Sequence, residues 1–214
     1  IAAPAAARSD LERSLTVAPA AFAAQMRWLR AHGYRSVTHR QLYDALAGTG
    51  ELPRKPVLVT FDDGYVDVLR DALPALRAVG FTAAAYVITE RIDGDDTSFL
   101  RMAHLRRLER AGIEIGSHTV SHADLTALSD ADALRELRRS RATLEHGLGH
   151  PVQWLCYPAG RYDARVERLA QEAGYVLATT TEPGVLQDPD APLALHRVRI
   201  ADTTGIAGLA AALG

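Results

Sequence analysis

Two short stretches of the sequence carry side chains that commonly bind metal ions. The stretch VTFDDGY holds the adjacent carboxylates Asp62 and Asp63, and the stretch SHTVSH holds His118 and His122 four positions apart. Taken alone, the acidic pair also fits a turn or a helix cap, and two such histidines also occur on solvated loops. Histidines at positions i and i+4 lie on one side of a helical turn and can converge on one metal ion. The two stretches together therefore indicate a metal site more strongly than either does alone.

A set of two histidine nitrogens and one aspartate oxygen leaves positions open on a divalent metal ion. Open positions are typical of catalytic sites, whereas a structural zinc site has a fourth protein ligand. A metal bound in this way lowers the pKa of a bound water and polarises a carbonyl group. The second carboxylate of the pair could then take the proton of that water as a general base. These residue types predict metal-assisted hydrolysis.

Strand-like and helix-like segments alternate along most of the chain. Apolar, β-branched runs predict strands at 34–38, 56–61, 82–89, 113–118, 153–158, 175–180 and 196–200. Helical periodicity predicts helices at 18–33, 40–48, 66–80, 99–112, 130–149 and 164–174, and a last helix after residue 204. Strands separated by helices pair in parallel through crossover connections. We therefore expect an α/β fold, a barrel or a doubly wound sheet, and about seven parallel strands favour the barrel.

Polar clusters follow several of these predicted strands. They are the pair Asp62 and Asp63, the stretch SHTVSH at 117–122, the stretch CYPAGRYD at 156–163, and His196 in the last strand. In parallel α/β folds the functional residues sit at the carboxyl ends of the strands, where the loops converge. We expect all four clusters to lie near one rim of the fold.

The composition is that of a soluble globular protein. We expect a loosely held arm over residues 1–15 and a single domain over residues 16–214, since 48% of the residues are hydrophobic and 23% are charged. A net charge of −2 gives no general attraction for nucleic acid or anionic membranes. No apolar run reaches the roughly 18 residues of a membrane span. The start IAAPAAARSD holds no intact signal peptide, so an export signal could have been removed. We expect a monomer that is not transmembrane.

The motifs resemble those of the polysaccharide deacetylases of carbohydrate esterase family 4, which share the NodB homology domain. TFDDG at 60–64 is similar to the first motif of the family and SHTVSH to the second. The stretches AAFAAQMRWLRAHGYRSVT, CYPAGRYD and LHRVRI resemble a bacterial branch that includes poly-N-acetylglucosamine deacetylases. The resemblance covers most of the chain and implies a distorted (β/α) barrel with seven or eight strands, which agrees with the alternation of predicted elements.

The resemblance also implies roles for individual residues. Asp62 would be the general base, and Asp63, His118 and His122 would hold a divalent metal ion, usually zinc, with cobalt or nickel as alternatives. The backbone N–H of Ala159 would stabilise the oxyanion, a role that does not depend on the side chain.

Two family features are altered or missing in this sequence. Cys156 stands where many members carry the arginine that orients the base, and the arginines available to replace it are Arg161, Arg197 and Arg199. The fourth motif, whose acidic residue tunes the catalytic histidine, has no convincing copy. That histidine, the general acid toward the leaving amine, best matches His196. The remaining histidines are expected at the surface: His32, His39, His104, His146 and His150.

The expected reaction is removal of acetyl groups from an N-acetylglucosamine-containing glycan such as a chitooligosaccharide, poly-N-acetylglucosamine or peptidoglycan. O-deacetylation of acetylxylan uses the same metal chemistry and stays open as an alternative. A glycan-binding protein without turnover, or a cysteine hydrolase with Cys156 as nucleophile, are further alternatives. The resemblance alone places the expected enzyme outside the cell or at the cell envelope.

Overall fold

The centre of the protein is a curved parallel β-sheet. The computed structural model describes residue 1 and residues 14–214, so most of the expected arm over residues 1–15 lies outside the described residues. Six strands pair in the order β3-β4-β5-β6-β7-β8, and β1 and β2 form a separate parallel pair. The strands are β1 (Arg35–Ser36), β2 (Pro56–Val57), β3 (Thr60–Phe61), β4 (Ala83–Val87), β5 (Ile113–Ser117), β6 (Trp154–Cys156), β7 (Leu177–Pro183) and β8 (Leu195–Arg197).

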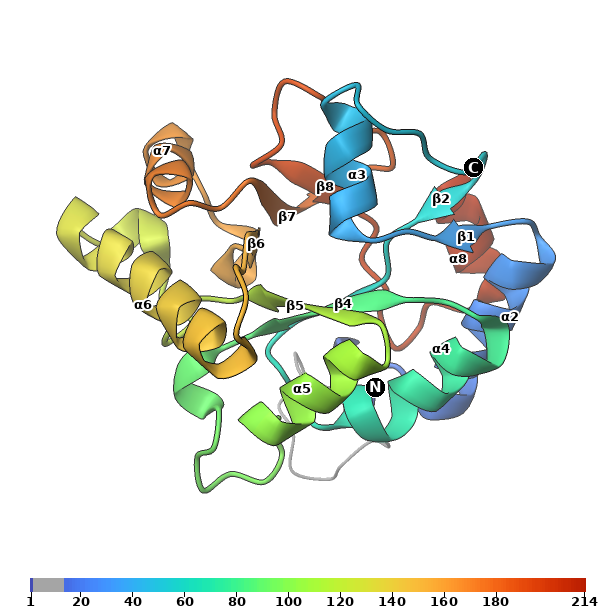
Figure 1. Ribbon diagram of the computed structural model, residues 1–214. Helices are drawn as coiled ribbons and strands as arrows, with labels where there is room; N and C mark the ends of the chain where they lie inside the picture. Colours follow the sequence, from blue (N-terminus) through green and yellow to red (C-terminus); the bar gives the residue numbers. More distant parts are fainter. Residues whose placement is uncertain (2–13) are drawn as a thin grey trace.

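The six-stranded sheet curls into a half barrel with helices around it (Figure 1). This confirms the expected distorted (β/α) barrel. The described strands number eight rather than about seven, because the predicted strand at 56–61 is divided into β2 and β3, which belong to different sheets.

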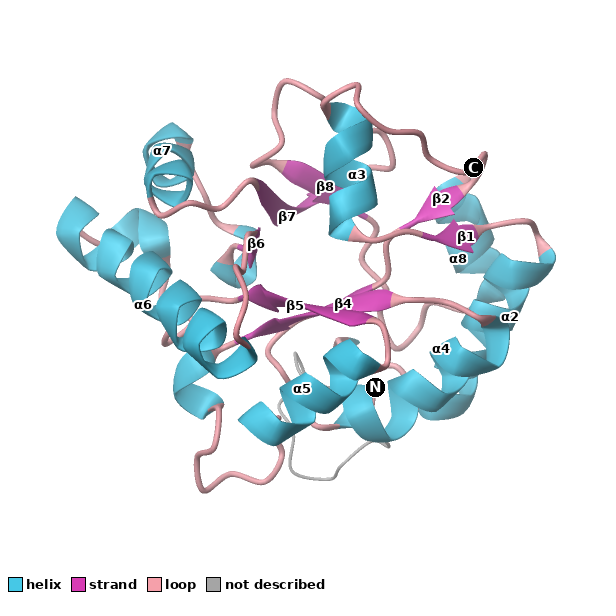
Figure 2. Ribbon diagram, viewed as in Figure 1, coloured by secondary structure: helices cyan, strands magenta, loops and turns pink. Residues whose placement is uncertain are grey.

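Helices connect most of the parallel strands (Figure 2). The described α-helices are α2 (Pro19–Ala31), α3 (His39–Leu46), α4 (Leu73–Val79), α5 (Met102–Arg110), α6 (Asp130–Leu148), α7 (Ala164–Glu172) and α8 (Ile206–Leu213), and a π-helical turn at Val68–Ala72 leads into α4. Ser129 and Asp163 cap the amino ends of α6 and α7 by accepting backbone N–H bonds. Gly80 and Gly149 end α4 and α6 in the left-handed conformation that glycine adopts without strain.

Two clusters of buried apolar residues lie between the sheet and the helices outside it. One cluster includes Leu76 and Leu105 from α4 and α5, and the other includes Leu137 and Leu169 from α6 and α7. Strand β4 is buried along its whole length, as expected for a central parallel strand. Burying these side chains is the main favourable contribution to folding.

His39, the first residue of helix α3, is fully buried against residues of β4, β5 and β6. The ring of His39 lies 2.5 Å from the Tyr86 hydroxyl through Nε2 and 2.9 Å from Glu114 Oε2 through Nδ1. It also stacks on Trp154 with ring centroids 5.1 Å apart. The expectation that His39 is a surface residue is therefore wrong, because its partners come from β4, β5 and β6, which are remote in sequence.

Among the residues that the structure describes, no helix is both long enough and apolar enough to cross a membrane.

Candidate active site

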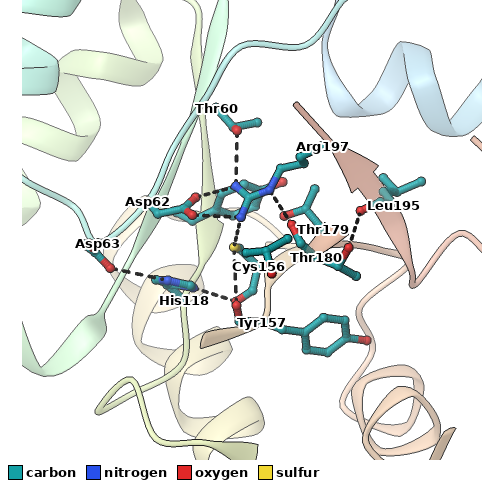
Figure 3. A network of polar contacts seen from close by, with 12 residues as sticks. Thr60, Asp62, Asp63, His118, Cys156, Tyr157, Thr179, Thr180, Leu195 and Arg197 are labelled. Atoms are coloured by element: carbon teal, nitrogen blue, oxygen red, sulfur yellow. Dashed lines mark hydrogen bonds and ion pairs between the residues drawn. The ribbon is translucent and has the colours of Figure 1, made fainter. Parts of the chain in front are cut away.

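The carboxyl ends of β3, β5 and β8 bring the candidate site residues together. Asp62 and Asp63 directly follow β3, and His118 directly follows β5. Arg197, the last residue of β8, reaches Asp62 across the sheet (Figure 3). The structure thus places these polar clusters at one rim, where the parallel arrangement of the strands predicts them.

Asp63, His118 and His122 form a cluster that fits a metal ion. The Nε2 atoms of His118 and His122 lie 3.5 Å and 3.7 Å from Asp63 Oδ1. One ligand atom from each residue lies within 4.8 Å of the other two. His118 is buried, whereas Asp63 and His122 are each more than a third exposed, so one side of the cluster is open to solvent. Two imidazoles and one carboxylate with an open side match the donor set of a catalytic zinc site.

The ring of His118 has a fixed orientation. Its Nδ1 atom lies 2.7 Å from the backbone carbonyl oxygen of Cys156 (Figure 3). Because a carbonyl oxygen can only accept, Nδ1 carries the hydrogen, and Nε2 is left to face Asp63. This partner fixes the tautomer that a metal-binding histidine needs.

The charges around the cluster favour a cation. Burial lowers the pKa of His118, but Cys156 and the carboxyls of Asp63 and Asp62 outweigh burial and raise it well above its usual value. Burial and the neighbouring His118 lower the pKa of His122. The negative field that favours a proton on one histidine also favours a divalent cation between the ligands.

The stretch that carries both histidines is a loop and not the helical turn that their i, i+4 spacing suggested. Thr119 and His122 both have left-handed backbone angles, with φ of 66° and 65°. The Thr119 N–H donates to Ser117 Oγ at 3.1 Å, and the His122 N–H donates to Thr119 Oγ1 at 3.1 Å. In this conformation of the loop, both imidazoles face the same carboxylate.

Asp62 forms a bidentate ion pair with Arg197. The two guanidinium nitrogens lie 2.8 Å and 2.9 Å from the two carboxylate oxygens. Arg197 is held in turn by the carbonyl oxygen of Thr180, to which Nε donates at 2.6 Å, and its Nη2 lies 3.4 Å from Cys156 Sγ (Figure 3). Burial raises the pKa of the Asp62 carboxyl, but Arg197 outweighs burial and holds the pKa well below its usual range. Asp62 is therefore ionised and fixed in orientation.

Of the three arginines expected as replacements for the missing one, Arg197 is the one that contacts Asp62. Arg161 pairs with Asp124 at 2.7 Å, and Arg199 is exposed. The sequence alone could not choose among them, because the contact between β8 and the end of β3 joins residues 135 positions apart.

Ala159 lies in the turn after β6 with φ 53° and ψ 15°, a left-handed conformation that costs a residue with a side chain about 1–2 kcal/mol. Its carbonyl oxygen accepts a hydrogen bond from Thr181 Oγ1 at 3.3 Å. Its N–H has no acceptor among the described residues. An oxyanion donor needs such a free N–H.

Backbone strain is concentrated in this region. Five described residues other than glycine have positive φ, and four of them belong to the three motifs: Asp63, Thr119, His122 and Ala159. Each such residue persists only because its surroundings impose the conformation, and strain of this kind gathers at functional sites.

His196, in β8, contacts residues other than those of this cluster. Its Nε2 lies 3.4 Å from Glu182 Oε2, and its backbone N–H donates to Gln187 Oε1 at 2.9 Å. Glu182 also accepts a hydrogen bond from the Tyr162 hydroxyl at 3.0 Å. Arg197, the next residue in β8, points to Asp62, and successive side chains of a strand point to opposite faces. The sequence alone did not predict the contact between His196 and Glu182, because no motif marks Glu182.

The similarity to known proteins agrees with this geometry. The family described as polysaccharide deacetylase matches residues 49–178, more than half of the chain. The chain is 32% identical over 197 residues to YxkH of Bacillus subtilis, which carries the name of the same family, and the match covers 92% of this chain and 69% of YxkH. It is 30% identical over 122 residues to the poly-β-1,6-N-acetyl-D-glucosamine N-deacetylase of Escherichia coli, covering 50% of this chain and 18% of that protein.

Solved structures share the whole fold. The deacetylase PplD of Streptococcus pyogenes, determined with acetate, superposes with a TM-score of 0.89 at 27% identity and covers 97% of this chain and 93% of PplD. IcaB from Ammonifex degensii superposes with a TM-score of 0.82 at 27% identity, covering 92% of this chain and 90% of IcaB. This protein belongs to the polysaccharide deacetylase family.

Proposed function

We propose that the protein is a metal-dependent hydrolase that removes acetyl groups from N-acetylglucosamine units of a glycan. The observation that carries the proposal is the division of the two adjacent carboxylates: Asp63 faces His118 and His122, whereas Asp62 is held by Arg197. One carboxylate is thus available to a cation, and the other is ionised beside it and available as a base.

Asp63, His118 and His122 would hold the metal, with zinc first and cobalt or nickel as alternatives. When bound, the metal lowers the pKa of a water molecule and polarises the acetyl carbonyl group. Asp62 accepts the proton of that water, and Arg197 keeps the carboxylate oriented for the transfer. The free N–H of Ala159 donates to the oxygen that becomes negative as the carbonyl is attacked.

His196 is the proposed general acid that gives a proton to the leaving amine. Its contact with Glu182 supports the proposal, because a carboxylate partner holds an imidazole ring in a fixed orientation. The alternation of side chains along β8, with Arg197 directed to Asp62, weighs against it. A substitution at His196 separates the two possibilities.

The proposed substrate class rests on the relatives. The E. coli relative is named for deacetylation of poly-β-1,6-N-acetyl-D-glucosamine, and several relatives in Staphylococcus aureus carry the same name at 21% identity. An N-acetylated glycan outside the cell or at the cell envelope is the proposed target, and acetylxylan is the second candidate.

The proposal is tested by acetate release with and without a chelator. Chitooligosaccharides, poly-N-acetylglucosamine, peptidoglycan and acetylxylan are offered to zinc-loaded protein. We expect acetate from an N-acetylated glycan, loss of that activity on metal removal, and recovery on adding zinc. Asp62→Asn is expected to bind zinc like the wild type and to lose at least about 100-fold in turnover. His196→Gln is expected to lose about 10²- to 10⁴-fold if His196 is the acid.

Other outcomes would favour the alternatives. Full activity after rigorous metal removal would overturn the mechanism, and glycan binding without acetate release would favour a binding protein. Activity that disappears on thiol alkylation would favour Cys156 as nucleophile, although that thiol is fully buried and a substrate could not reach it in this conformation.

A further inference from the structure

Glu136, on helix α6, is hydrogen-bonded to the loop between the two metal-binding histidines. Its Oε2 atom accepts the backbone N–H groups of Val120 and Ser121, each at 2.9 Å. Its Oε1 atom accepts the Ser121 hydroxyl at 2.9 Å. One carboxylate thus receives three hydrogen bonds from two consecutive loop residues. Bonds from N–H groups to an ionised carboxylate are stronger than bonds between neutral groups.

The same face of α6 holds the beginning of the loop. Ser140, one helical turn after Glu136, contacts the hydroxyl of Ser117 and lies 3.2 Å from the Tyr175 hydroxyl. Ser117 Oγ in turn accepts the N–H of Thr119. The backbone N–H groups of residues 120 and 121 therefore donate to Glu136 of α6. The N–H of Thr119 donates to Ser117, whose hydroxyl contacts Ser140 of α6.

The segment after β4 holds the other edge of the loop. The N–H of Thr89 donates to the carbonyl oxygen of Thr119 at 3.1 Å, and that of Glu90 donates to the carbonyl oxygen of Val120 at 3.0 Å. The loop lies between two supports, and its left-handed residues Thr119 and His122 are fixed by protein contacts. Hydrogen bonds within the protein therefore fix the conformation that brings the histidines together.

We propose that Glu136 is a positioning residue that holds the His118–His122 loop ready for the metal before the metal binds. The inference rests on the proposed function, because it concerns the ligands assigned there. A ligand set fixed in advance loses less conformational freedom on binding, so the metal binds more tightly. Partners that orient metal ligands commonly change metal affinity by 10- to 100-fold when they are removed.

The experiment measures zinc affinity by competition with a chromophoric chelator, starting from metal-free protein. Glu136→Ala is expected to bind zinc about 10- to 100-fold more weakly than the wild type. The matched control is Glu145→Ala on the same helix. Glu145 accepts the N–H of Val152 at 3.0 Å and pairs with Arg141 at 2.9 Å, so it ties α6 to the loop before β6. The control is expected to bind zinc within about threefold of the wild type.

Two further variants separate the effect of geometry from the effect of charge. They keep the test possible if Glu136→Ala does not fold. Glu136→Gln keeps the length and one acceptor oxygen but loses the charge, whereas Glu136→Asp keeps the charge but is too short to reach both N–H groups. If positioning is the role, zinc affinity falls in the order wild type, Gln, Asp. If the negative charge near the cation were what matters, Asp would bind zinc more tightly than Gln, and that order would overturn the inference.

Thermal unfolding of the metal-free proteins and acetate release at saturating zinc complete the test. We expect Glu136→Ala to regain most of its kcat when zinc is in excess, because the ligands and the base are intact. If Glu136→Ala and Glu136→Asp both bind zinc within about threefold of the wild type, the inference is overturned and the proposed function is not affected. If Asp63→Asn binds zinc as tightly as the wild type, both the proposed function and this inference are overturned.

Discussion

At the residue scale, two adjacent carboxylates receive different tasks from their surroundings. The left-handed backbone of Asp63, with φ 72°, directs its side chain to the histidines while Asp62 stays with Arg197. Gly64 follows with φ 81°, and a side chain there would lie 2.8 Å from Val87. Only glycine fits this position, so the turn that separates the two roles requires Gly64.

Arg197→Met is expected to destabilise the protein and to remove most of its activity. The pair is largely buried, with 17% of the Arg197 side chain and 32% of the Asp62 side chain exposed. Leaving the carboxylate unpaired is expected to lower the free energy of unfolding by about 2–3 kcal/mol, since Asp62 keeps some contact with water. A base that has lost its orientation is expected to cost about 100-fold in kcat. Chemical denaturation and acetate release measure the two effects.

The double variant Asp62→Asn/Arg197→Met shows whether the loss comes from the ion pair itself. It is expected to be more stable than Arg197→Met, with a coupling energy of about 1–3 kcal/mol, and to remain inactive. The control is Arg161→Met, which breaks an exposed pair with Asp124 and should change stability by no more than about 0.5 kcal/mol. Additive effects of the two substitutions would contradict a direct interaction between Asp62 and Arg197.

Ala159→Gly is expected to stabilise the protein while preserving activity. Glycine removes the cost of the left-handed conformation but adds freedom to the unfolded chain, so the net gain is about 0.5–1 kcal/mol. Ala159→Val is expected to be destabilising, because a β-branched residue fits this conformation poorly. Thermal unfolding and acetate release are the measurements. A loss of more than about tenfold in kcat for Ala159→Gly would show that the side chain takes part, contrary to the role of the backbone N–H.

At the scale of the elements, the sequence predicts those parts of the fold that depend on local patterns. Helix α6 is predicted by its helical periodicity and by the glycine that ends it, and the buried strand β4 is predicted by its apolar run. Asp62, Asp63 and His118 also lie at the carboxyl ends of strands, where functional residues of parallel α/β folds are expected. The loop at 118–122 could not be predicted, because the i, i+4 spacing fits a helical turn, and contacts from Glu136 and from the segment after β4 impose another conformation. These contacts join positions that no local pattern connects.

At the scale of the whole molecule, helix α3 lies between β8 and the β1–β2 pair at the open side of the half barrel (Figure 1). No pairing between the two sheets is found among the described residues. The interior under α3 is filled by aromatic and polar side chains: His39, Tyr86, Glu114 and Trp154. A single histidine in an amphipathic helix gave no sign of this role, since its burial depends on how the barrel closes.

His39→Leu is therefore expected to weaken the fold without changing metal binding. The substitution leaves the buried Tyr86 hydroxyl and one oxygen of Glu114 with fewer partners, and a buried polar group without a partner costs about 1–3 kcal/mol. We expect the free energy of unfolding of the metal-free protein to fall by about 2–4 kcal/mol. His146→Leu, at an exposed position of α6, is the control and should change it by no more than about 0.5 kcal/mol. Zinc affinity should stay within about threefold of the wild type, the opposite of the pattern expected for Glu136→Ala. A large loss of zinc affinity in His39→Leu would show that the closure of the barrel and the metal site are coupled, and that the loop is not positioned by its local supports alone.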